Sequence, residues 1–450
     1  MARTEIIAAE NGNGQKSTWR FILRALQYRN YRLFFSGQSI SLIGTWMTRI
    51  ATSWLVYRLT GSALLLGMVG FAGQIPTFLL GPFAGAWVDR WNRHHTLVVT
   101  QVLSMLQSLA LAGLALAHII TIRDVIWLSV AQGLINAFDM PARQSFVVEM
   151  VENREDMGNA IALNSSMVNA ARLLGPSIAG VVIAAVGEGY CFLIDGISYV
   201  AVIFSLLAMR VENRPRPPRK SAILVEIREG WNYATHSVAI RSLLLLLALI
   251  SLVGMPYTVL MPIFAGQVLH GGAHTLGFLM GASGIGALTG ALWLAARRSV
   301  LGLGKVIAAS AGIFGTGLIA FGFSRQLWLS LILMLFVGGA MMQQMAASNT
   351  ILQTIVDDDK RGRVMSLYSM SFMGMAPFGS LLAGWLANRI GAPHTVIISG
   401  ALCLLGAGWF TYSLPTIRNA VRPIYLELGI LSEIAAGVAT TSVLLTPPED

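Results

Sequence analysis

The amino-acid sequence predicts an all-α polytopic membrane protein with twelve transmembrane helices in two pseudo-symmetric halves of six. Three observations lead to this fold class. Of the 450 residues, 55% are hydrophobic and 12% are charged, which is not the composition of a soluble domain of this size. Apolar runs long enough to cross about 30 Å of hydrocarbon recur along the chain. Features of the first half of the sequence also recur in the second half.

A window of about 20 residues gives the predicted spans. In the first half they lie at residues 34–57, 64–88, 96–118, 125–147, 160–186 and 190–210, and in the second half at 242–266, 275–296, 305–323, 327–352, 364–388 and 394–414. The chain is therefore expected to consist of an N-terminal segment (1–33), one six-helix half (34–210), a linker (211–241), a second half (242–414) and a tail (415–450).

The two halves share small residues at matching positions. The matches include Gly175 with Gly379 and Gly180 with Gly384, and a shift one residue longer aligns Gly81 with Gly286 and Gly85 with Gly290. Small residues at this spacing let helices approach closely in lipid. Two halves that start on the same side of the membrane form a parallel repeat.

Basic residues predict the orientation. If both termini are cytoplasmic, the residues in the outer loops are Arg58, Arg123, Arg325 and Arg389, while most of the 31 Lys and Arg residues lie in cytoplasmic segments. This distribution follows the positive-inside rule. We expect a multi-pass protein of the plasma membrane or the bacterial inner membrane. The net charge of +10 is then explained by topology and by lipid headgroups, with no nucleic acid as a partner.

The linker and the tail are the main polar segments. Residues 210–242 contain three prolines and seven basic residues, and the pattern predicts a cytoplasmic linker with a short interfacial helix around Ile223–Tyr233. Residues 424–445 are apolar but contain Glu427, Glu433 and a glycine. We expect the tail to be an amphipathic or loose cytoplasmic segment and not a thirteenth span.

No pattern of catalytic or metal-ligating residues stands out. Cys191 and Cys403 lie in apolar spans without metal-ligand spacing, which predicts buried structural thiols. The sequence has no HExxH motif, nucleophile elbow or GxxxxGK[ST] loop. The prediction is therefore that the protein is not an enzyme and has no cofactor and no metal site. A membrane enzyme is a disfavoured alternative.

Polar side chains form stripes on three of the predicted spans. At 100° per residue each stripe covers an arc of about 60° to 100°. The residues that we predict to line the substrate pathway are Gln38, Thr45 and Arg49 on the first span, Gln132 and Asn136 on the fourth, and Asn169 and Arg172 on the fifth, joined by Gln343 and Asn349 on the tenth. Three stripes indicate a shared hydrated cavity; the alternative is hydrogen bonding between helices.

The loop after the second span carries a recognisable motif. Gly85-x-x-x-Asp89-Arg90-x-x-Arg93, preceded by Gly81, resembles the signature loop of the major facilitator superfamily. Residues 37–67, 138–147 and 361–368 are similar to the branch that contains enterobactin exporters, macrolide efflux proteins and transmembrane secretion effectors. The resemblance implies the major facilitator fold and alternating access around a central path lined by the first, fourth and fifth spans.

The same resemblance implies a latch between the halves. The glycines would let the second span pack against the eleventh, Asp89 would meet the N-terminal end of that helix, and Arg90 and Arg93 would reach Asp139. The sequence departs from the family in places. Leu294 and Ala295 replace the charges in the second copy. Ser129 replaces an arginine of the fourth-span pattern, and alanines replace two glycines of the fifth-span antiporter pattern, which weakens the case for proton antiport.

Two carboxylates lie well inside predicted spans. Asp139 shares its stripe with Arg143 one turn on, and Asp195 lies on the sixth span. An ionised side chain inside a membrane costs about 2.5–3.5 kcal/mol, so we predict Asp139, Arg143 and Asp195 as coupling or gate residues. The alternative for Asp139 is a structural ion pair. The resemblance implies that the sixth span is a scaffold helix, so the alternative for Asp195 is a role without coupling.

The predicted function is a secondary active transporter that exports an organic small molecule, siderophore-like or drug-like, by proton-coupled antiport. Two intramembrane arginines favour an anionic or strongly hydrogen-bonding substrate, and methionines on the tenth and eleventh spans suit bulky ligands. The expected partners are the substrate, the lipid bilayer and protons, with the oligomeric state left open. The alternative is a non-transporting scaffold or sensor built on a carrier fold, which would not need three polar stripes.

Overall fold

The computed structural model describes residues 23–88, 90–151, 153–211, 223–297 and 299–430. These residues form an all-helical structure without strands. Ten of its helices are long and apolar enough to cross a membrane. They overlap ten of the predicted spans. The predicted spans at 34–57 and 125–147 fall on α2 and α5, two helices of comparable length whose polar stripes lower their mean hydropathy.

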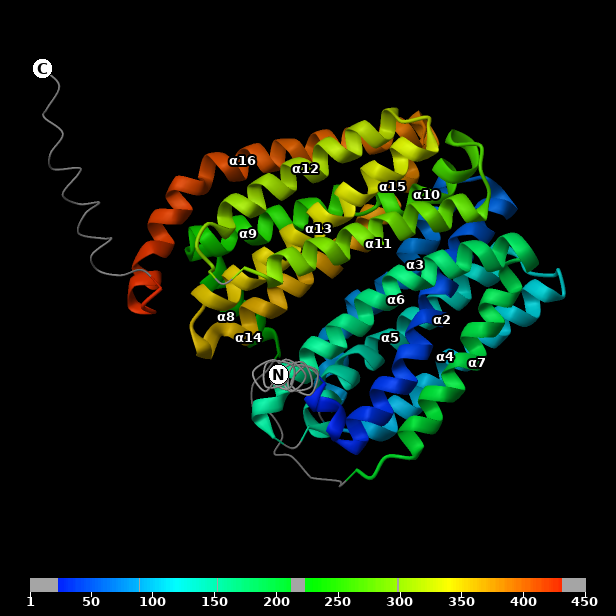
Figure 1. Cartoon of the computed structure of the whole chain (residues 1–450), viewed down its shortest axis with the longest axis horizontal. Helices are drawn as coiled ribbons and strands as arrows, with labels where there is room; N and C mark the ends of the chain where they lie inside the picture. Colours follow the sequence, from blue (N-terminus) through cyan, green and yellow to red (C-terminus); the bar gives the residue numbers. More distant parts are fainter. Residues whose placement is uncertain (1–22, 89, 152, 212–222, 298, 431–450) are drawn as a thin grey trace, which may run out of the picture.

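The N-terminal group of helices comes first in the chain (Figure 1). Its elements are η1 (Arg24–Gln27), α2 (Arg29–Thr60), α3 (Ala63–Val88), α4 (Arg93–Leu116), α5 (Ile122–Met150), η2 (Arg154–Asp156), α6 (Met157–Val186) and α7 (Glu188–Leu207). Helix α2 ends at Gly61, whose φ of 60° is left-handed and therefore suits glycine. Helix α5 begins with a capping box between Thr121 and Asp124.

The C-terminal group contains interrupted helices. Its elements are α8 (Ile223–His236), α9 (Val238–Leu249), η3 (Ile250–Gly254), α10 (Tyr257–Ile263), η4 (Phe264–Val268), α11 (Ala273–Ala295), α12 (Leu303–Phe323), α13 (Leu327–Ile355), α14 (Asp358–Ser369), η5 (Met370–Gly374), α15 (Ala376–Ile390) and α16 (Ala392–Glu427). The π-helical turns η3 and η5 come just before Pro256 and Pro377, because proline removes a backbone hydrogen-bond donor and breaks the regular ladder.

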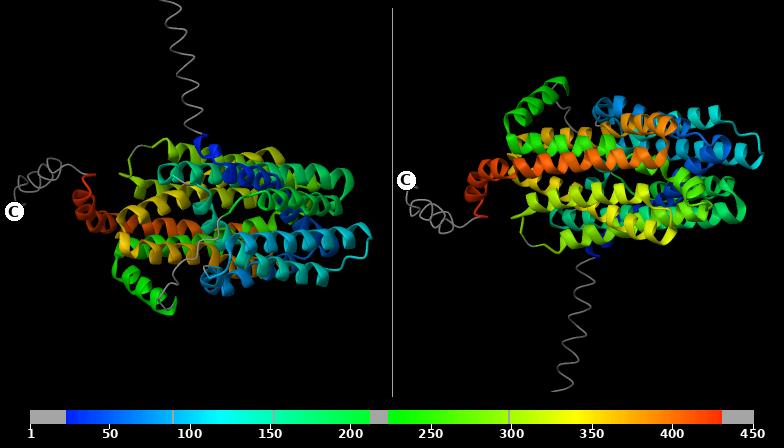
Figure 2. Two further views of the ribbon diagram at one scale, coloured as in Figure 1. Left: turned by 90° about the horizontal axis from the view of Figure 1, so that it is seen from below. Right: turned by 90° about the horizontal axis from the view of Figure 1, so that it is seen from above.

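The structure bears on two predictions about the polar segments. The predicted helix around Ile223–Tyr233 is confirmed by α8, which lies at an angle to the long helices (Figure 2). Helix α16 continues to Glu427, through the first part of the predicted tail. The tail residues 431–450 and the linker residues 212–222 lie outside the described part of the chain.

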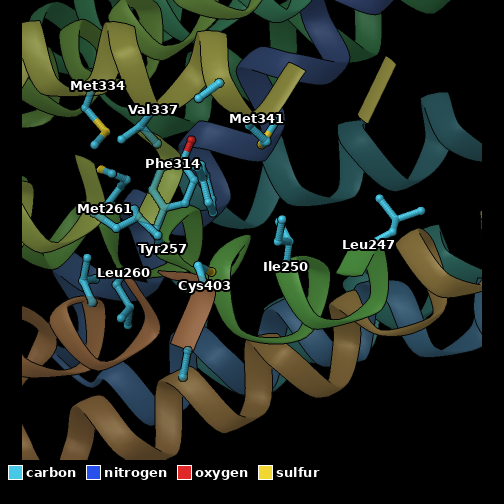
Figure 3. Close-up of a cluster of buried hydrophobic side chains, with 14 of the residues drawn as sticks. Leu247, Ile250, Tyr257, Leu260, Met261, Phe314, Met334, Val337, Met341 and Cys403 are labelled. Carbon is cyan, nitrogen blue, oxygen red and sulfur yellow. The ribbon is translucent and has the colours of Figure 1, made fainter. Parts of the chain in front are cut away.

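Packing divides the helices into two groups. In the first, α2 packs on α6 and α7, α4 on α5 and α7, and α3 on α5; in the second, α13 packs on α11 and α12, and α16 on α12 and α9. The second group encloses a core that includes Tyr257, Phe314 and Cys403 (Figure 3). Both cysteines are buried free thiols, which confirms that prediction.

In the described part of the chain, the most extensive contacts between the groups are those of α6 with α11 and of α3 with α15. A Cβ built on Gly180 would lie 2.9 Å from the Cα of Gly277, and one built on Gly67 would lie 2.9 Å from the Cα of Gly384. Only glycine allows such close approach. Both contacts lie toward the end of the bundle where α3 and α11 begin. The groups meet there and diverge toward the end that carries α8 and α14 (Figure 1).

Candidate functional site

Two arginines from different helices lie on one indole ring. The Cζ of Arg49 on α2 is 4.7 Å from the centroid of the Trp46 ring, and the Cζ of Arg172 on α6 is 5.9 Å from it. Both distances are within the range of cation–π attraction. The local sequence produces this arrangement, because a Cβ on Gly175 would overlap the Cβ of Trp46. The glycine therefore brings α6 onto α2 one turn away from Arg172.

The C-terminal group faces the same site. Helix α11 packs on α6 at Gly284, where a Cβ would lie 3.1 Å from the Cα of Leu173, the neighbour of Arg172. Tyr257 on α10 interacts electrostatically with Arg172, and its hydroxyl is 3.0 Å from Ser283 Oγ on α11. The hydroxyl pair from α10 and α11 thus lies near the Arg172 cation of α6.

The residues of the polar stripe on α2 lie in two different environments. Gln38 and Ser41 are buried, at 2% and 1% exposure. Thr45 donates to the backbone oxygen of Ser41 (3.0 Å) and lies 3.2 Å from the Tyr199 hydroxyl on α7. Arg49, in contrast, is exposed although it lies in the middle of the helix. In this conformation Thr45 of the stripe contacts α7, whereas Arg49 lies on the Trp46 ring.

The other predicted pathway residues form hydrogen bonds mainly within their own group. Gln132 donates to Ser104 Oγ (3.3 Å) and Asn136 Oδ1 (3.1 Å), Asn169 donates to the Ser165 oxygen (2.9 Å), Ser310 donates to Gln343 Oε1 (3.1 Å), and Gln353 donates to Asn349. The roles of these residues in the substrate pathway stay predictions.

Both carboxylate oxygens of Asp139 accept hydrogen bonds. Its carboxylate is 5% exposed and accepts from Thr100 Oγ1 (2.9 Å), Gln101 Nε2 (2.7 Å) and Arg143. The Arg143 partner is one helical turn away on α5. A buried carboxylate needs such partners to remain charged. This is the structural ion pair that the sequence leaves open as an alternative to a gate.

The expected contacts of the signature loop with Asp139 are not formed. Arg93 pairs instead with Glu149 of α5, at 2.8 Å. Glu149 lies further along α5 toward the loop, whereas the oxygens of Asp139 are occupied by nearer donors. Arg90 is exposed. Asp89 lies outside the described residues, so its predicted contact with the eleventh span stays a prediction.

The expected packing of the loop glycines is also wrong for this conformation. A Cβ on Gly81 would meet no heavy atom within 4 Å, and one on Gly85 would meet only Pro141 of the same group, at 4.0 Å. The predicted pairing of the second span with the eleventh is confirmed, because α3 packs on α15. The close contact lies near the other end of α3, at Gly67 and Gly384. The reason is the divergence of the two groups, which carries the loop end of α3 away from the C-terminal group.

Asp195 lies apart from the arginines. It is 1% exposed on α7, accepts from Ser108 Oγ on α4 at 2.7 Å, and faces Gly44 of α2. It is therefore buried inside the N-terminal group, where α7 packs on α2, next to the polar stripe of α2.

Some residues of this arrangement were missed by sequence reasoning. Trp46 carries no polar signal; its spacing of three residues from Arg49 was the available clue. Glu149, the partner of Arg93, was also missed, as was the ion pair of Arg58 with Glu188 (2.8 Å). The partners in both pairs lie far apart in the sequence, and helical periodicity cannot predict such contacts.

Several known proteins are similar to this chain in sequence. The family model described as transmembrane secretion effector matches residues 22–423. The staphyloferrin A transporter of Staphylococcus aureus is 26% identical over 383 residues, which cover 84% of this chain and 95% of the relative. The multidrug efflux pump Tap of Mycolicibacterium fortuitum is 27% identical over 84% of this chain and 93% of its own. Macrolide efflux protein A of Streptococcus pyogenes is 24% identical over 84% and 95%.

Solved structures show the same fold. A bacterial homologue of the human lysosomal transporter Spinster, in an inward-facing and unoccupied conformation, has a TM-score of 0.67 at 14% identity and covers 87% of this chain and 98% of its own. An inward-facing bacterial homologue of the iron transporter ferroportin has a TM-score of 0.66 at 17% identity, with 85% and 98% coverage. The chain therefore belongs to the transmembrane secretion effector family of the major facilitator superfamily, whose members are membrane transporters.

Proposed function

We propose that this transporter exports an organic anion, siderophore-like or drug-like in size, which binds at Arg49 and Arg172. The observation that carries the proposal is the location of both guanidinium groups on Trp46. The printed names of the relatives, a staphyloferrin A transporter and multidrug and macrolide efflux proteins, support export of small organic molecules. The chain then acts as a carrier and not as an enzyme.

The charge of the site supports an anionic substrate. Within the described part of the chain, neither Arg49 nor Arg172 forms an ion pair with a carboxylate; their contacts are with Trp46. Two guanidinium groups on one ring repel each other, and a bound anion removes that repulsion. Planar guanidinium groups bind carboxylates in a bidentate manner, and the exposed face of an indole can stack on an aromatic substrate.

The membrane arrangement belongs to the same proposal. Helices α2 and α5 also cross the bilayer, which completes twelve spans in two halves of six, with segments 1–33, 211–241 and 415–450 in the cytoplasm. The lysines and arginines on one side support this orientation. The conformation is then inward-facing, because the halves meet at the outer end through Gly180 with Gly277 and Gly67 with Gly384. Alternating access proceeds by rocking of the halves, driven by protons.

The test is transport by purified protein in proteoliposomes. The probes are the anionic dye carboxyfluorescein and the cationic dye ethidium, and the variants are Arg49→Ala and Arg172→Ala. A lost charge-assisted contact of about 1.5–3 kcal/mol corresponds to roughly 10- to 150-fold weaker binding. We expect each variant to lose anion transport to that degree.

Arg389→Ala is the matched control, because Arg389 also lies on an indole, 5.3 Å from the Trp385 centroid, but at the outer end of α15. It is expected to transport carboxyfluorescein at the wild-type rate. Preferred transport of ethidium, together with unchanged rates in both arginine variants, would refute the anion site.

A further inference from the structure

The carboxyl group of Asp195 has two oxygens in different surroundings. Oδ2 accepts from Ser108 Oγ of α4 at 2.7 Å. Oδ1 faces Gly44 of α2, where a Cβ would lie 2.7 Å from it. Among the described residues, Oδ1 is buried and has no hydrogen-bond partner. One oxygen is therefore satisfied as an acceptor, and the other is not.

Two of the three hydroxyl groups near Oδ1 use their protons elsewhere. Ser198 Oγ, which borders Gly44 together with Oδ1, donates to the backbone oxygen of Asp195 at 2.7 Å. Thr45, which interacts with Asp195, donates to the backbone oxygen of Ser41 at 3.0 Å. Thr48 Oγ1, which also interacts with Asp195, is buried and has no other partner within the described chain. Of these three groups only Thr48 has a proton free for Oδ1, and all three are neutral.

Protonation of Oδ1 gives both oxygens of the carboxyl group a role in hydrogen bonding. A carboxylic acid can donate from Oδ1 to a threonine hydroxyl while Oδ2 still accepts from Ser108. An ionised carboxylate would have at most a neutral hydroxyl donor at Oδ1, and a buried charge without a counter-charge is far more costly than a buried neutral group. Among the described residues that pack on Asp195, no cation compensates the charge. The facing side of α4 presents Gln107 and Ser108, and Arg49 on α2 lies on Trp46.

Other titratable groups near Asp195 lie mainly on its own helix. They are Glu188, which pairs with Arg58, the Cys191 thiol and the Tyr199 hydroxyl. Arg172 of α6 lies on Trp46, apart from Asp195. None of these groups supplies a positive charge at Oδ1, so the neutral acid is the form that fits the site.

We propose that Asp195 is the binding site of the transported proton, occupied on Oδ1 in the conformation described here. The inference rests on the proposed transport function. On release the Oδ1–H bond breaks, its electron pair stays on Oδ1, and the proton passes to water that enters when α2 moves away from α7. Thr48 and Arg49 are adjacent on α2, so a movement of α2 on substrate binding changes the proton site directly.

Infrared difference spectroscopy of the purified full chain tests occupancy without any transport. We expect a protonated carboxyl band at neutral pH that is missing in Asp195→Asn and present in the control Glu188→Gln. Ser108→Ala removes the donor that stabilises the ionised form, and it is expected to move the titration of this band to higher pH. Absence of the band from the wild type, or its persistence in Asp195→Asn, would overturn the proposal.

Proteoliposomes test coupling. Asp195→Asn is expected to lose accumulation of carboxyfluorescein driven by a pH gradient at least about tenfold more than it loses exchange of the dye at equal pH. Glu188→Gln should lose neither selectively. Gradient-driven accumulation at the wild-type rate in Asp195→Asn would refute the coupling role. A wild-type protein that moves no dye in either assay would contradict the proposed function, and the infrared band would still decide whether Asp195 carries a proton.

Substitution of two glycines on α2 distinguishes an effect on the proton site from an effect on helix packing in general. Gly44 and Gly37 both pack on α7, but a Cβ on Gly44 would contact Asp195 and one on Gly37 would contact Ser205. Gly44→Ala is expected to shift the pH at which the carboxyl band titrates, and Gly37→Ala is expected to leave it unchanged. Equal shifts in both variants would show that α2 packing, and not contact with Asp195, sets the protonation.

Discussion

Arg49 and Arg172 belong to helices α2 and α6, and both guanidinium groups lie within 6 Å of the Trp46 ring centroid. Two cations on one ring at a helix crossing are an unfavourable arrangement, since the like charges repel each other. The crossing at Gly175 maintains it. The simplest physical reason to retain such a pair is a ligand of opposite charge.

Removing the ring should weaken the site without removing its charge. Cation–π attraction is worth about 0.5–2 kcal/mol, so Trp46→Ala should raise the Kd for carboxyfluorescein about 2- to 30-fold, and Trp46→Phe should raise it less. Fluorescence titration of the purified protein measures both. Trp385→Ala, which removes the ring under Arg389, is the control. Equal Kd values for Trp46→Ala and the wild type would mean that the ring does not position the arginines.

Enlarging the outer contact should change the population of conformations. Gly180→Ala places a methyl group 2.9 Å from the Cα of Gly277, and such overpacking costs about 1–3 kcal/mol. We expect the halves to separate at the outer end, with a larger distance between spin labels on the ends of α6 and α11. Gly312→Ala, whose Cβ would meet nothing within 4 Å, should keep the wild-type distance. An unchanged distance in Gly180→Ala would mean that this contact does not hold the outer end closed.

The ion pair in α5 should be structural. Arg143→Ala leaves the buried carboxylate of Asp139 with two neutral donors, and breaking a buried pair costs about 3–5 kcal/mol. We expect a large decrease in the midpoint of thermal unfolding in detergent. Adding Asp139→Asn should recover part of it, because no charge is then left unpaired. A double variant that is less stable than Arg143→Ala would contradict the pairing as the source of the loss.

Helix α8 should be held on α14 by two polar contacts. Glu229 pairs with Arg363 at 2.8 Å, and the Tyr233 hydroxyl donates to Asp357 at 3.1 Å. Burial, opposed by a backbone hydrogen bond and reinforced by the Asp357 carboxylate, raises the pKa of Tyr233. The hydroxyl therefore still donates at pH values where an ordinary tyrosine begins to ionise, and its contribution is lost as pH rises through the raised pKa.

Hydrogen exchange of the α8 backbone measures this docking. Glu229→Gln and Tyr233→Phe should each speed exchange in α8. High salt should weaken the wild-type contact and have little further effect on Glu229→Gln, because exposed ion pairs are screened. The same exchange rate in the wild type and both variants would show that apolar contacts alone hold the helix.

Much of the fold follows from hydropathy, because apolar length and small-residue spacing are local properties. Helices α2 and α5 are less apolar than the other long helices because of their polar stripes, and the same window still predicts both. The stripe on α2 was visible in the sequence, but its division was not: an arc of about 100° is wide enough for two neighbours, so Thr45 meets α7 while Arg49 meets Trp46.

The latch at the signature loop could not be derived from the sequence. Whether Gly81 and Gly85 touch the other half depends on how the two halves are tilted relative to each other. A carrier with one sequence adopts more than one tilt, so the sequence does not determine this contact. The partner of Arg93 likewise depends on the competition between Glu149 and Asp139, which only their positions on the folded α5 decide.

The central claim, an anion site shared by Arg49 and Arg172, is tested most directly by a double-mutant cycle on carboxyfluorescein binding. Arg49→Ala and Arg172→Ala should each raise the Kd about tenfold or more. The double variant should raise it by less than the product of the two factors, because one anion contacts both groups. Unchanged Kd values in the single variants, or full multiplication in the double variant, would contradict a shared site.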